Sequence, residues 1–397
     1  MKGFESLREA IAKHLPRPMY ILMPTMLMSL SLITVLAVLY GISMNPPTRA
    51  EDISSGLILV VMNILGLGTS SFGKNLAAGA AVVLREVKAV ITREVPADLR
   101  KSTRIFFGAV DDIRMLKKTN AEKVERLTVA VRNALAKSAP EGIVVSALED
   151  VEVVSGAEQG FYAWLAVNYL MGIFRKVPQE ALTRSGMKAM AFGHSYNLYS
   201  HSHLCYGVAT IRARYLARLT EGSDLRKPVA SPCHQSGLSM EVASDDVFQA
   251  PCVTSAGEDM MGPSIAKPSG APARIAFRGD YDAIRCGRAI EAILADASFA
   301  GVYRPLVRDD FAAIYKLWEI VTSFKKANHS VKVTRTQFAT AIDSFCTSNW
   351  TTEQATSGEK CLQGWIVKGL LEAYGFNNDN DWSRVTFLGD VSSVMHE

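Results

Sequence analysis

The feature that most constrains this chain is an uncharged stretch near its N-terminus, from Met19 to Met44. About 20 apolar residues are enough to cross a bilayer as a helix, because lipid cannot satisfy exposed backbone groups. A cleaved signal peptide usually has an apolar region of only about 7–15 residues, and no small-x-small cleavage site stands out here. We therefore expect a transmembrane signal anchor over residues 19–44.

The residues before this stretch predict its orientation. Residues 1–18 contain four basic side chains and two glutamates, and basic residues favour the cytosolic side of a membrane. Residues 1–18 should then form a cytosolic tail, and the rest of the chain should be translocated. This topology describes a single-pass type II membrane protein that faces the Golgi or ER lumen or the cell exterior.

The cysteines fit a translocated domain. Their number is even and none forms a CxxC pair, which argues against zinc ligation and favours three disulfides. In the same half of the chain, Asn328 and Asn349 begin glycosylation sequons, which are informative only if this topology holds. The six cysteines are Cys205, Cys233, Cys252, Cys286, Cys346 and Cys361.

A second uncharged segment, residues 53–73, leaves the topology open. Its apolar part, Leu57–Leu65, is short for a membrane span and favours a buried strand. The alternative, a second membrane helix, would return the main domain to the cytosol.

The pattern along the rest of the chain predicts an α/β architecture. Strands are expected at residues 104–107 and 151–154, and residues 230–279, rich in Pro, Ser and Gly, are expected to form loops. Thr119 and Glu122 read as a capping box opening an amphipathic helix. Further helices are expected at residues 160–174, 208–219, 281–295, 311–325, 337–345 and 360–374. A net charge of +4 without a Lys/Arg run gives no indication of a nucleic-acid partner.

Two short motifs suggest ligand sites but lack necessary parts. Residues 68–74 fit the phosphate-binding pattern G-x-x-x-x-G-K, yet Asn75 stands where the pattern needs a hydroxyl for magnesium. His201 and His203 have the spacing of strand metal ligands, but no carboxylate cluster accompanies them. We interpret the first as a turn before a helix and the second as packing residues.

A third motif, Ser155 to Gly160, has more specific chemistry. A strand–turn–helix junction with Gly156 and Gly160 lets backbone N–H groups approach a phosphate. A carboxylate there, Glu158, could take a proton from an attacking water, or could be a solvated acid of the first turn.

This motif, continued through Trp164 and Asn168, resembles the third signature block, S-G-x-E-E-G-x-x-x-W-x-x-x-N-Y-L-x-G, of the apyrase and guanosine-diphosphatase family of nucleoside phosphatases. Similarity to the family extends over residues 66–390. The type II anchor resembles the Golgi guanosine-diphosphatase branch in particular.

The resemblance implies a two-lobed actin/hexokinase-like (ribonuclease H-like) fold, with lobes at residues 45–170 and 171–397. A nucleoside di- or triphosphate and Ca²⁺ or Mg²⁺ would bind between the lobes, and water would attack the terminal phosphate. Phosphate contacts would come from Arg114, Ser155, Gly156 and Gly160. The implied disulfides are Cys205–Cys252, Cys233–Cys286 and Cys346–Cys361.

The sequence also departs from the family pattern. The first phosphate-binding block is missing between Tyr40 and Gly66, and the fourth is missing from residues 173–190. The second block, residues 109–114, keeps Arg114 but loses its Thr and Gly. The family's general base, the second Glu of E-E-G, is Gln159, and an amide cannot take a proton from water near neutral pH.

We therefore expect a family member with impaired or absent hydrolysis. Three alternatives stay open: a weak nucleotidase in which Glu158 replaces the base, a non-catalytic lumenal binding or scaffold protein, and a decaying gene product that folds poorly.

Overall fold

The computed structural model describes two compact units. Unit 1 comprises residues 27–202 with the terminal residues 1–19 and 390–397, and unit 2 comprises residues 20–26 and 203–389. The lobes expected at residues 45–170 and 171–397 stay a prediction. The described residues are 20–22, 57–60, 104–109, 112–138, 151–170, 187–191, 194–198, 200, 202–250, 252–253, 265–295, 310–350 and 358–389.

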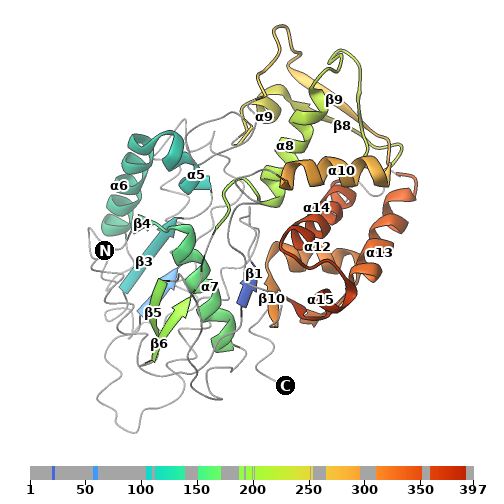
Figure 1. Ribbon diagram of the computed structural model, residues 1–397. Coiled ribbons are helices and arrows are strands. Elements are labelled where there is room, and N and C mark those ends of the chain that lie inside the picture. Colours follow the sequence, from blue (N-terminus) through green and yellow to red (C-terminus); the bar gives the residue numbers. More distant parts are fainter. Residues whose placement is uncertain are drawn as a thin grey trace, which may run out of the picture. The chain divides into compact units, whose positions relative to one another are not determined.

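Unit 1 has a parallel three-stranded sheet in the order β2-β3-β4 (Figure 1). Both strands expected at residues 104–107 and 151–154 are present, and the segment 57–60 is a strand, as favoured. An antiparallel pair, β5 and β6, follows later in the chain. The elements are β2 (Leu57–Val60), β3 (Arg104–Ala109), α5 (Asp112–Thr119), α6 (Ala121–Ser138), β4 (Val151–Val153), α7 (Gly156–Leu170), β5 (Met187–Ala191) and β6 (His194–Leu198).

Helix α6 is amphipathic as expected, but the predicted cap is wrong. Thr119 ends α5, and Asn120 Oδ1 accepts the N–H of Lys123 at 3.0 Å. An asparagine at this position satisfies an orphan N–H of the first turn, so the helix begins one residue later than the Thr119 capping box predicts. Its buried stripe consists of Val124, Leu127 and Val131.

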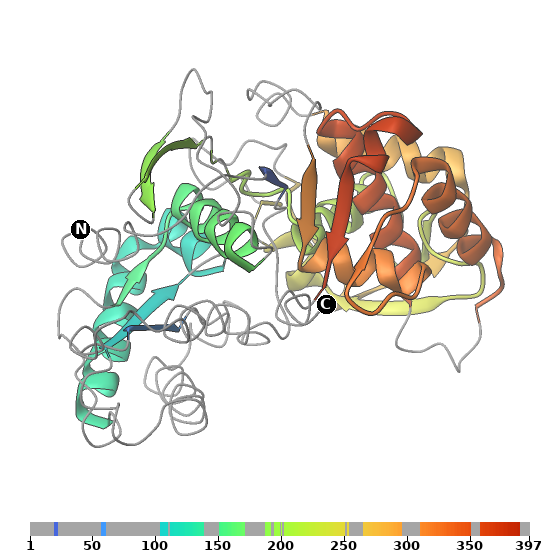
Figure 2. The same ribbon diagram turned by 90° about the horizontal axis from the view of Figure 1, so that it is seen from below.

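Unit 2 contains two sheets, in the orders β1-β10-β12-β11 and β7-β9-β8. Figure 2 shows its C-terminal helices on one side of strands β10 and β12. The strands are β1 (Tyr20–Leu22), β7 (Val229–Ser231), β8 (Ser239–Ala243), β9 (Arg274–Gly279), β10 (Phe311–Ile314), β11 (Ser330–Val331) and β12 (Val385–Leu388). The helices are α8 (Val208–Thr220), α9 (Ser244–Phe248), α10 (Ala283–Leu294), α12 (Lys316–Phe324), α13 (Arg335–Thr347), α14 (Lys360–Ala373) and α15 (Asp379–Ser383).

Two expectations in unit 2 are corrected. Residues 230–279, expected to be loops, contribute strands β7, β8 and β9, and in β9 the fully buried Ile275 and Phe277 alternate with residues that are exposed or half-buried. Residues 311–314, expected to begin a helix, form β10, all of whose residues are buried. Continuous apolar runs are typical of buried parallel strands, so this run does not show the alternation by which strands are recognised.

Strand β1 lies within the predicted membrane anchor. Residues 20–22 form a strand that pairs in parallel with β10, so at these three residues the structure differs from the expected helix. An uncharged apolar sequence suits a buried parallel strand as well as a membrane span, because both demand apolar side chains all round. The remainder of residues 19–44 lies outside the described part. No helix within the described part is long and apolar enough to cross a membrane.

Helix α14 packs among the other helices of unit 2 through two close approaches. A Cβ at Gly364 would lie 2.8 Å from the ring of Phe324, and one at Gly369 would lie 2.8 Å from Ile290 Cγ2. Both glycines therefore allow neighbouring helices to approach closer than any larger residue would permit. This packing surrounds α14 with α8, α10, α12 and α13.

Candidate functional site

The third motif forms the junction between β4 and α7 in unit 1, and its first two polar residues cap the helix. The N–H of Glu158 donates to Ser155 Oγ at 3.2 Å, and the N–H of Ser155 donates to Glu158 Oε2 at 2.9 Å. This reciprocal pair is a capping box, which satisfies two otherwise orphan donors. The Glu158 carboxylate is thus engaged by the backbone of its own helix.

The two glycines of the motif lie on a face of α7 that other side chains occupy. A Cβ at Gly156 would clash with the side chain of Ser202 and would lie 2.5 Å from Arg114 Nη1. A Cβ at Gly160 would clash with Ser200 Oγ, which donates to the carbonyl of Ala157 at 2.7 Å. Only glycine permits this close approach.

Arg114 reaches the same place from α5. Its side chain is 8% exposed, and its Nη2 donates to Ser202 Oγ at 2.9 Å. The predicted phosphate contacts Arg114, Ser155, Gly156 and Gly160 therefore gather at the first turn of α7. A guanidinium beside a helix N-terminus favours an anion through its charge, its planar donors and the helix dipole.

Gln159 follows directly on this turn, where its N–H donates to the carbonyl of Ser155 at 2.9 Å. Its Oε1 is buried and has no hydrogen-bond partner among the residues that the structure describes. A buried acceptor without a donor is uncommon in folded proteins, so this oxygen is available to accept a hydrogen bond. The amide can accept a hydrogen bond there but cannot act as a base.

The described residues of this site do not by themselves form a cation site. Among the described residues no group of three His, Cys, Asp or Glu side chains could hold a metal ion. At the α7 turn, Glu158 is already committed to the cap, and Arg114 contributes a positive charge. The Ca²⁺ or Mg²⁺ implied by the family resemblance thus finds no ligand set in this part of the chain.

The histidine motif is a packing feature where it is described. The ring of His203 meets those of Tyr206 and Tyr374 edge-on, with centroids 6.4 and 6.1 Å apart. This agrees with the packing interpretation for His203, while His201 lies outside the described residues. Residues 68–74, the other lesser motif, also lie outside them.

One unusual residue of unit 2, Tyr315, was not predicted from the sequence. It joins the end of β10 to α12 with φ 56° and ψ −122°, a left-handed backbone that non-glycine residues rarely adopt. Burial raises the pKa of its phenol. Strained residues gather at functional sites, and α/β proteins bind ligands beyond the carboxyl ends of parallel strands, so Tyr315 is a candidate ligand contact. The sequence has no glycine or turn residue at this position that would predict a positive φ.

A sequence model of the GDA1/CD39 (nucleoside phosphatase) family matches residues 45–195 and 179–394. This chain belongs to that family. The two matches overlap at residues 179–195, which include residues 179–190 of the segment where the fourth signature block is missing. The family assignment agrees with the resemblance carried by Ser155, Gly156 and Gly160.

Known proteins of the family align over most of the chain. Ectonucleoside triphosphate diphosphohydrolase 1 of Mus musculus is 22% identical, over 87% of this chain and 74% of its own length. Ectonucleoside triphosphate diphosphohydrolase 8 of Bos taurus is 26% identical, over 81% and 70%. A crystal structure of nucleoside triphosphate hydrolases from Neospora caninum superposes with a TM-score of 0.53 at 11% identity, covering 77% of this chain and 72% of that one. At that identity the superposition establishes a shared mixed α/β fold.

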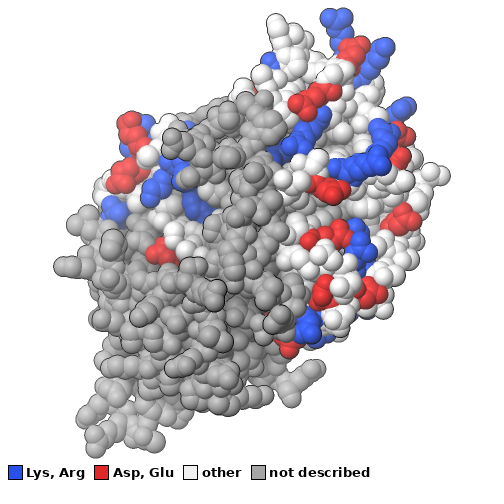
Figure 3. All heavy atoms as spheres, in the orientation of Figure 1, with Lys and Arg blue, Asp and Glu red and all other residues white. Residues whose placement is uncertain are grey.

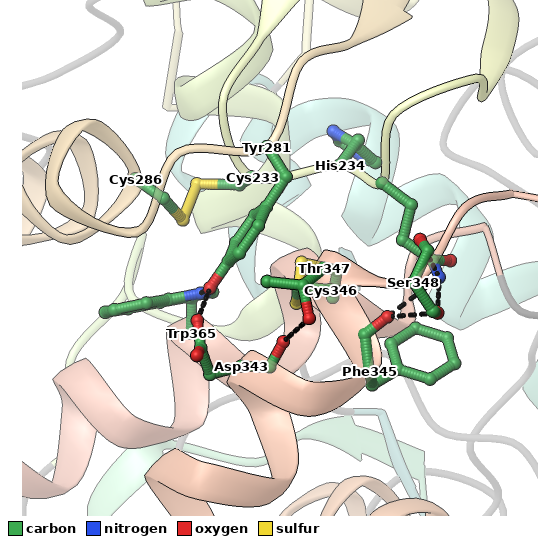
Figure 4. The surroundings of a disulfide bond; sticks show 12 residues. Cys233, His234, Tyr281, Cys286, Asp343, Phe345, Cys346, Thr347, Ser348 and Trp365 are labelled. Carbon is green, nitrogen blue, oxygen red and sulfur yellow. Dashed lines mark hydrogen bonds between the residues drawn. A yellow bond between two sulfur atoms is a disulfide. The ribbon is translucent and has the colours of Figure 1, made fainter.

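The disulfide pairing implied by the family resemblance is confirmed. Cys205–Cys252, Cys233–Cys286 and Cys346–Cys361 are all formed, with Cα–Cα distances of 5.5, 4.9 and 5.4 Å. Figure 4 shows the second of these bonds beside Tyr281. Both sequon asparagines of unit 2, Asn328 and Asn349, are exposed.

The described surface carries mixed charge. On the face drawn in Figure 3, Lys and Arg lie next to Asp and Glu. Examples are the exposed pairs Lys267–Asp245 and Arg274–Glu241, each with a 3.0 Å contact. Such pairing does not produce the one-sided basic surface typical of nucleic-acid binding.

Proposed function

We propose that this member of the GDA1/CD39 family binds nucleoside di- or triphosphates at the first turn of α7 but is impaired in hydrolysing them. The observation that carries the proposal is Gln159, an amide with a buried acceptor lacking a described partner where the resemblance places the general base. The substrate class follows the relatives, whose names identify them as triphosphate diphosphohydrolases.

The binding half of the proposal rests on charge. Arg114 lies beside the first turn of α7, whose N–H groups and dipole also favour an anion. The nearest acid of the motif, Glu158, is held in the cap. A phosphate at this turn would meet donors from Arg114 and the backbone.

The second part of the proposal, impaired hydrolysis, depends on proton transfer from the attacking water. A general base contributes about 10²–10⁴-fold to a rate, and only when water and phosphate are already positioned. Gln159 can hold the water through Oε1 but leaves the proton on it. Glu158 would have to leave its capping hydrogen bond before it could replace the base.

The test compares binding with turnover in the purified full chain. We expect measurable calorimetric binding of a non-hydrolysable nucleoside triphosphate analogue, and little phosphate release from di- or triphosphates with Mg²⁺ or Ca²⁺ present. Arg114→Met should weaken binding at least tenfold, since a charge-assisted contact contributes roughly 1.5–3 kcal/mol.

Two neighbouring substitutions separate the alternatives. Gln159→Glu should restore little turnover, because the developing phosphoryl charge still lacks the donors of the missing blocks. Turnover at ordinary enzyme rates that Glu158→Gln abolishes would instead identify Glu158 as the base. Absence of both binding and turnover would favour a scaffold or a decayed protein.

We further propose that the described parts of both units lie in the lumen or outside the cell. Residues 20–22 are no part of a membrane anchor in this proposal, because they form β1 within unit 2. Three disulfides and the exposed asparagines Asn328 and Asn349 support an oxidising, glycosylating compartment. Expressed in a eukaryotic host, the protein should lose mass on N-glycosidase treatment. Digestion of both units by protease outside sealed microsomes, with neither asparagine modified, would refute this topology.

A further inference from the structure

Two serines that follow β6 contact the first turns of α7 in unit 1. Ser200 lies against Gly160 and Ser202 lies against Gly156, because a Cβ on either glycine would clash with the serine that faces it. Two residues of extended chain span about 6.7 Å, and four residues of helix rise about 6 Å. The pair of serines and the pair of glycines therefore have matching spacings, which allows both serines to approach the backbone of α7.

The two serines have different hydrogen-bond partners. Ser200 Oγ donates to the carbonyl of Ala157 at 2.7 Å, so this serine binds the backbone of α7 itself. Ser202 Oγ accepts from Arg114 Nη2 at 2.9 Å. Among the described hydrogen bonds of the two serines, only that of Ser202 involves the charged group of the candidate site.

The guanidinium of Arg114 lies between Ser202 and Gly156. Its Nη2 is bonded to the serine hydroxyl, and its Nη1 is so near Gly156 that a Cβ there would lie 2.5 Å from it. The arginine belongs to α5, so this contact joins α5 to the N-terminus of α7 (Figure 1). A guanidinium is planar with fixed donor directions, so fixing two of its nitrogens also fixes where its other donors point.

A hydroxyl is a suitable anchor for an arginine that binds phosphate, because the hydroxyl is uncharged. A carboxylate in its place would neutralise the guanidinium and would compete with a phosphate for the same donors. Ser202 accepts a hydrogen bond and leaves the positive charge of Arg114 in place. The bond also restricts a long side chain before a ligand arrives, which lowers the entropy cost of binding.

We propose that Ser202 is a positioning residue that holds Arg114 at the first turn of α7 for a bound phosphate group. This role rests on the nucleotide binding proposed above for the same turn. Ser202 lies outside the four signature blocks, at the end of the central segment of unit 1. The missing side chain of Gly156 is then needed to admit both Ser202 and Arg114.

The test measures how inorganic tripolyphosphate and a non-hydrolysable ATP analogue bind to the purified full chain, by calorimetry. We expect Ser202→Ala to weaken binding of both probes by about three- to tenfold, the effect of losing one net hydrogen bond. Arg114→Met should weaken both by about tenfold or more. In the double variant, Ser202→Ala should add no further loss, because its effect passes through the arginine.

Ser200→Ala is the matched control. It removes the same hydroxyl from the same segment, together with the bond to Ala157, but it leaves Arg114 and Ser202 untouched. It should lower the free energy of unfolding about as much as Ser202→Ala and leave the affinity for both probes unchanged. Equal losses of affinity in the two serine variants would mean that Ser202 acts only through packing, and would overturn the proposal.

Arg114→Lys tests the same role with Ser202 in place. Lysine keeps the positive charge but has a single nitrogen, which cannot both bond Ser202 and lie against Gly156 as the guanidinium does. We expect tripolyphosphate to bind this variant almost as weakly as Arg114→Met. Affinity equal to the wild type in Arg114→Lys would overturn the positioning role even if Ser202→Ala does not fold.

The arginine variants also separate this proposal from the proposed function. If neither probe binds the wild type, or if Arg114→Met leaves both affinities unchanged, the nucleotide site is wrong and the role of Ser202 fails with it. If Arg114→Met weakens binding and Ser202→Ala does not, only the role of Ser202 is refuted. A loss from Ser202→Ala that persists in full alongside Arg114→Met refutes that role as well.

Discussion

Two buried polar clusters, one in each unit, differ in how completely their atoms are paired. In unit 2, successive hydrogen bonds connect the N–H of Cys233 with Tyr215, Ser231, His234 and Glu359. Arg212 also contacts the Glu359 carboxylate. At the α7 turn of unit 1, Gln159 Oε1 is buried without a partner in the described residues. A completed network stabilises a fold, whereas an unsatisfied group requires another explanation, such as a ligand.

The disulfides provide the largest test of this difference. Replacing Cys233 and Cys286 with Ala should cost unit 2 about 4 kcal/mol, because the bond spans 53 residues and anchors the turn that carries His234. Replacing Cys346 and Cys361, 15 residues apart, should cost about 3 kcal/mol. Denaturant unfolding of both double variants shows which replacement lowers the free energy of unfolding more. The reverse order would mean that native contacts, and not loop length, dominate.

Acid provides the next test. The pKa of Glu359 is about 2 in the folded protein and 4.5 without its partners, so its contribution is present above pH 4.5 and is lost as pH falls towards 2. This linkage amounts to about 2–3 kcal/mol. Glu359→Gln should remove that part of the pH dependence of the unfolding free energy.

Glu241→Gln is the control for this measurement. Its ion pair with Arg274 has both side chains about 60% exposed, so its loss should cost no more than about 0.5 kcal/mol. Equal effects of the two substitutions would contradict the stabilising role of the Glu359 pair.

The smallest effects come from two helix caps of unit 1. Ser155→Ala and Asn120→Ala each remove a side-chain cap, and each should cost about 1 kcal/mol of stability. Only Ser155→Ala should also weaken binding of the nucleotide analogue, because only α7 begins at the candidate site. Calorimetry on both variants checks this, and an equal loss of binding would place the nucleotide elsewhere.

Much of the candidate site followed from the sequence. The family resemblance gave the disulfide pairing, and the spacing of Ser155 to Gly160 placed a strand–turn–helix junction where β4 meets α7. The predictions that failed concern single elements. The cap at Asn120 competed with an equally plausible Thr119, and the apolar run of β10 carries no periodicity that distinguishes a buried strand from a helix.

Features that depend on a few adjacent residues could be predicted without the structure. The Ser155–Glu158 capping box needs only a spacing of three, and the absent base needs only the identity of Gln159. Tertiary structure alone brought Arg114 to Ser202, 88 residues away, and His234 to Glu359, 125 residues away. Such contacts form only after long loops are closed by packing of the whole unit, and no local pattern of side chains encodes that closure.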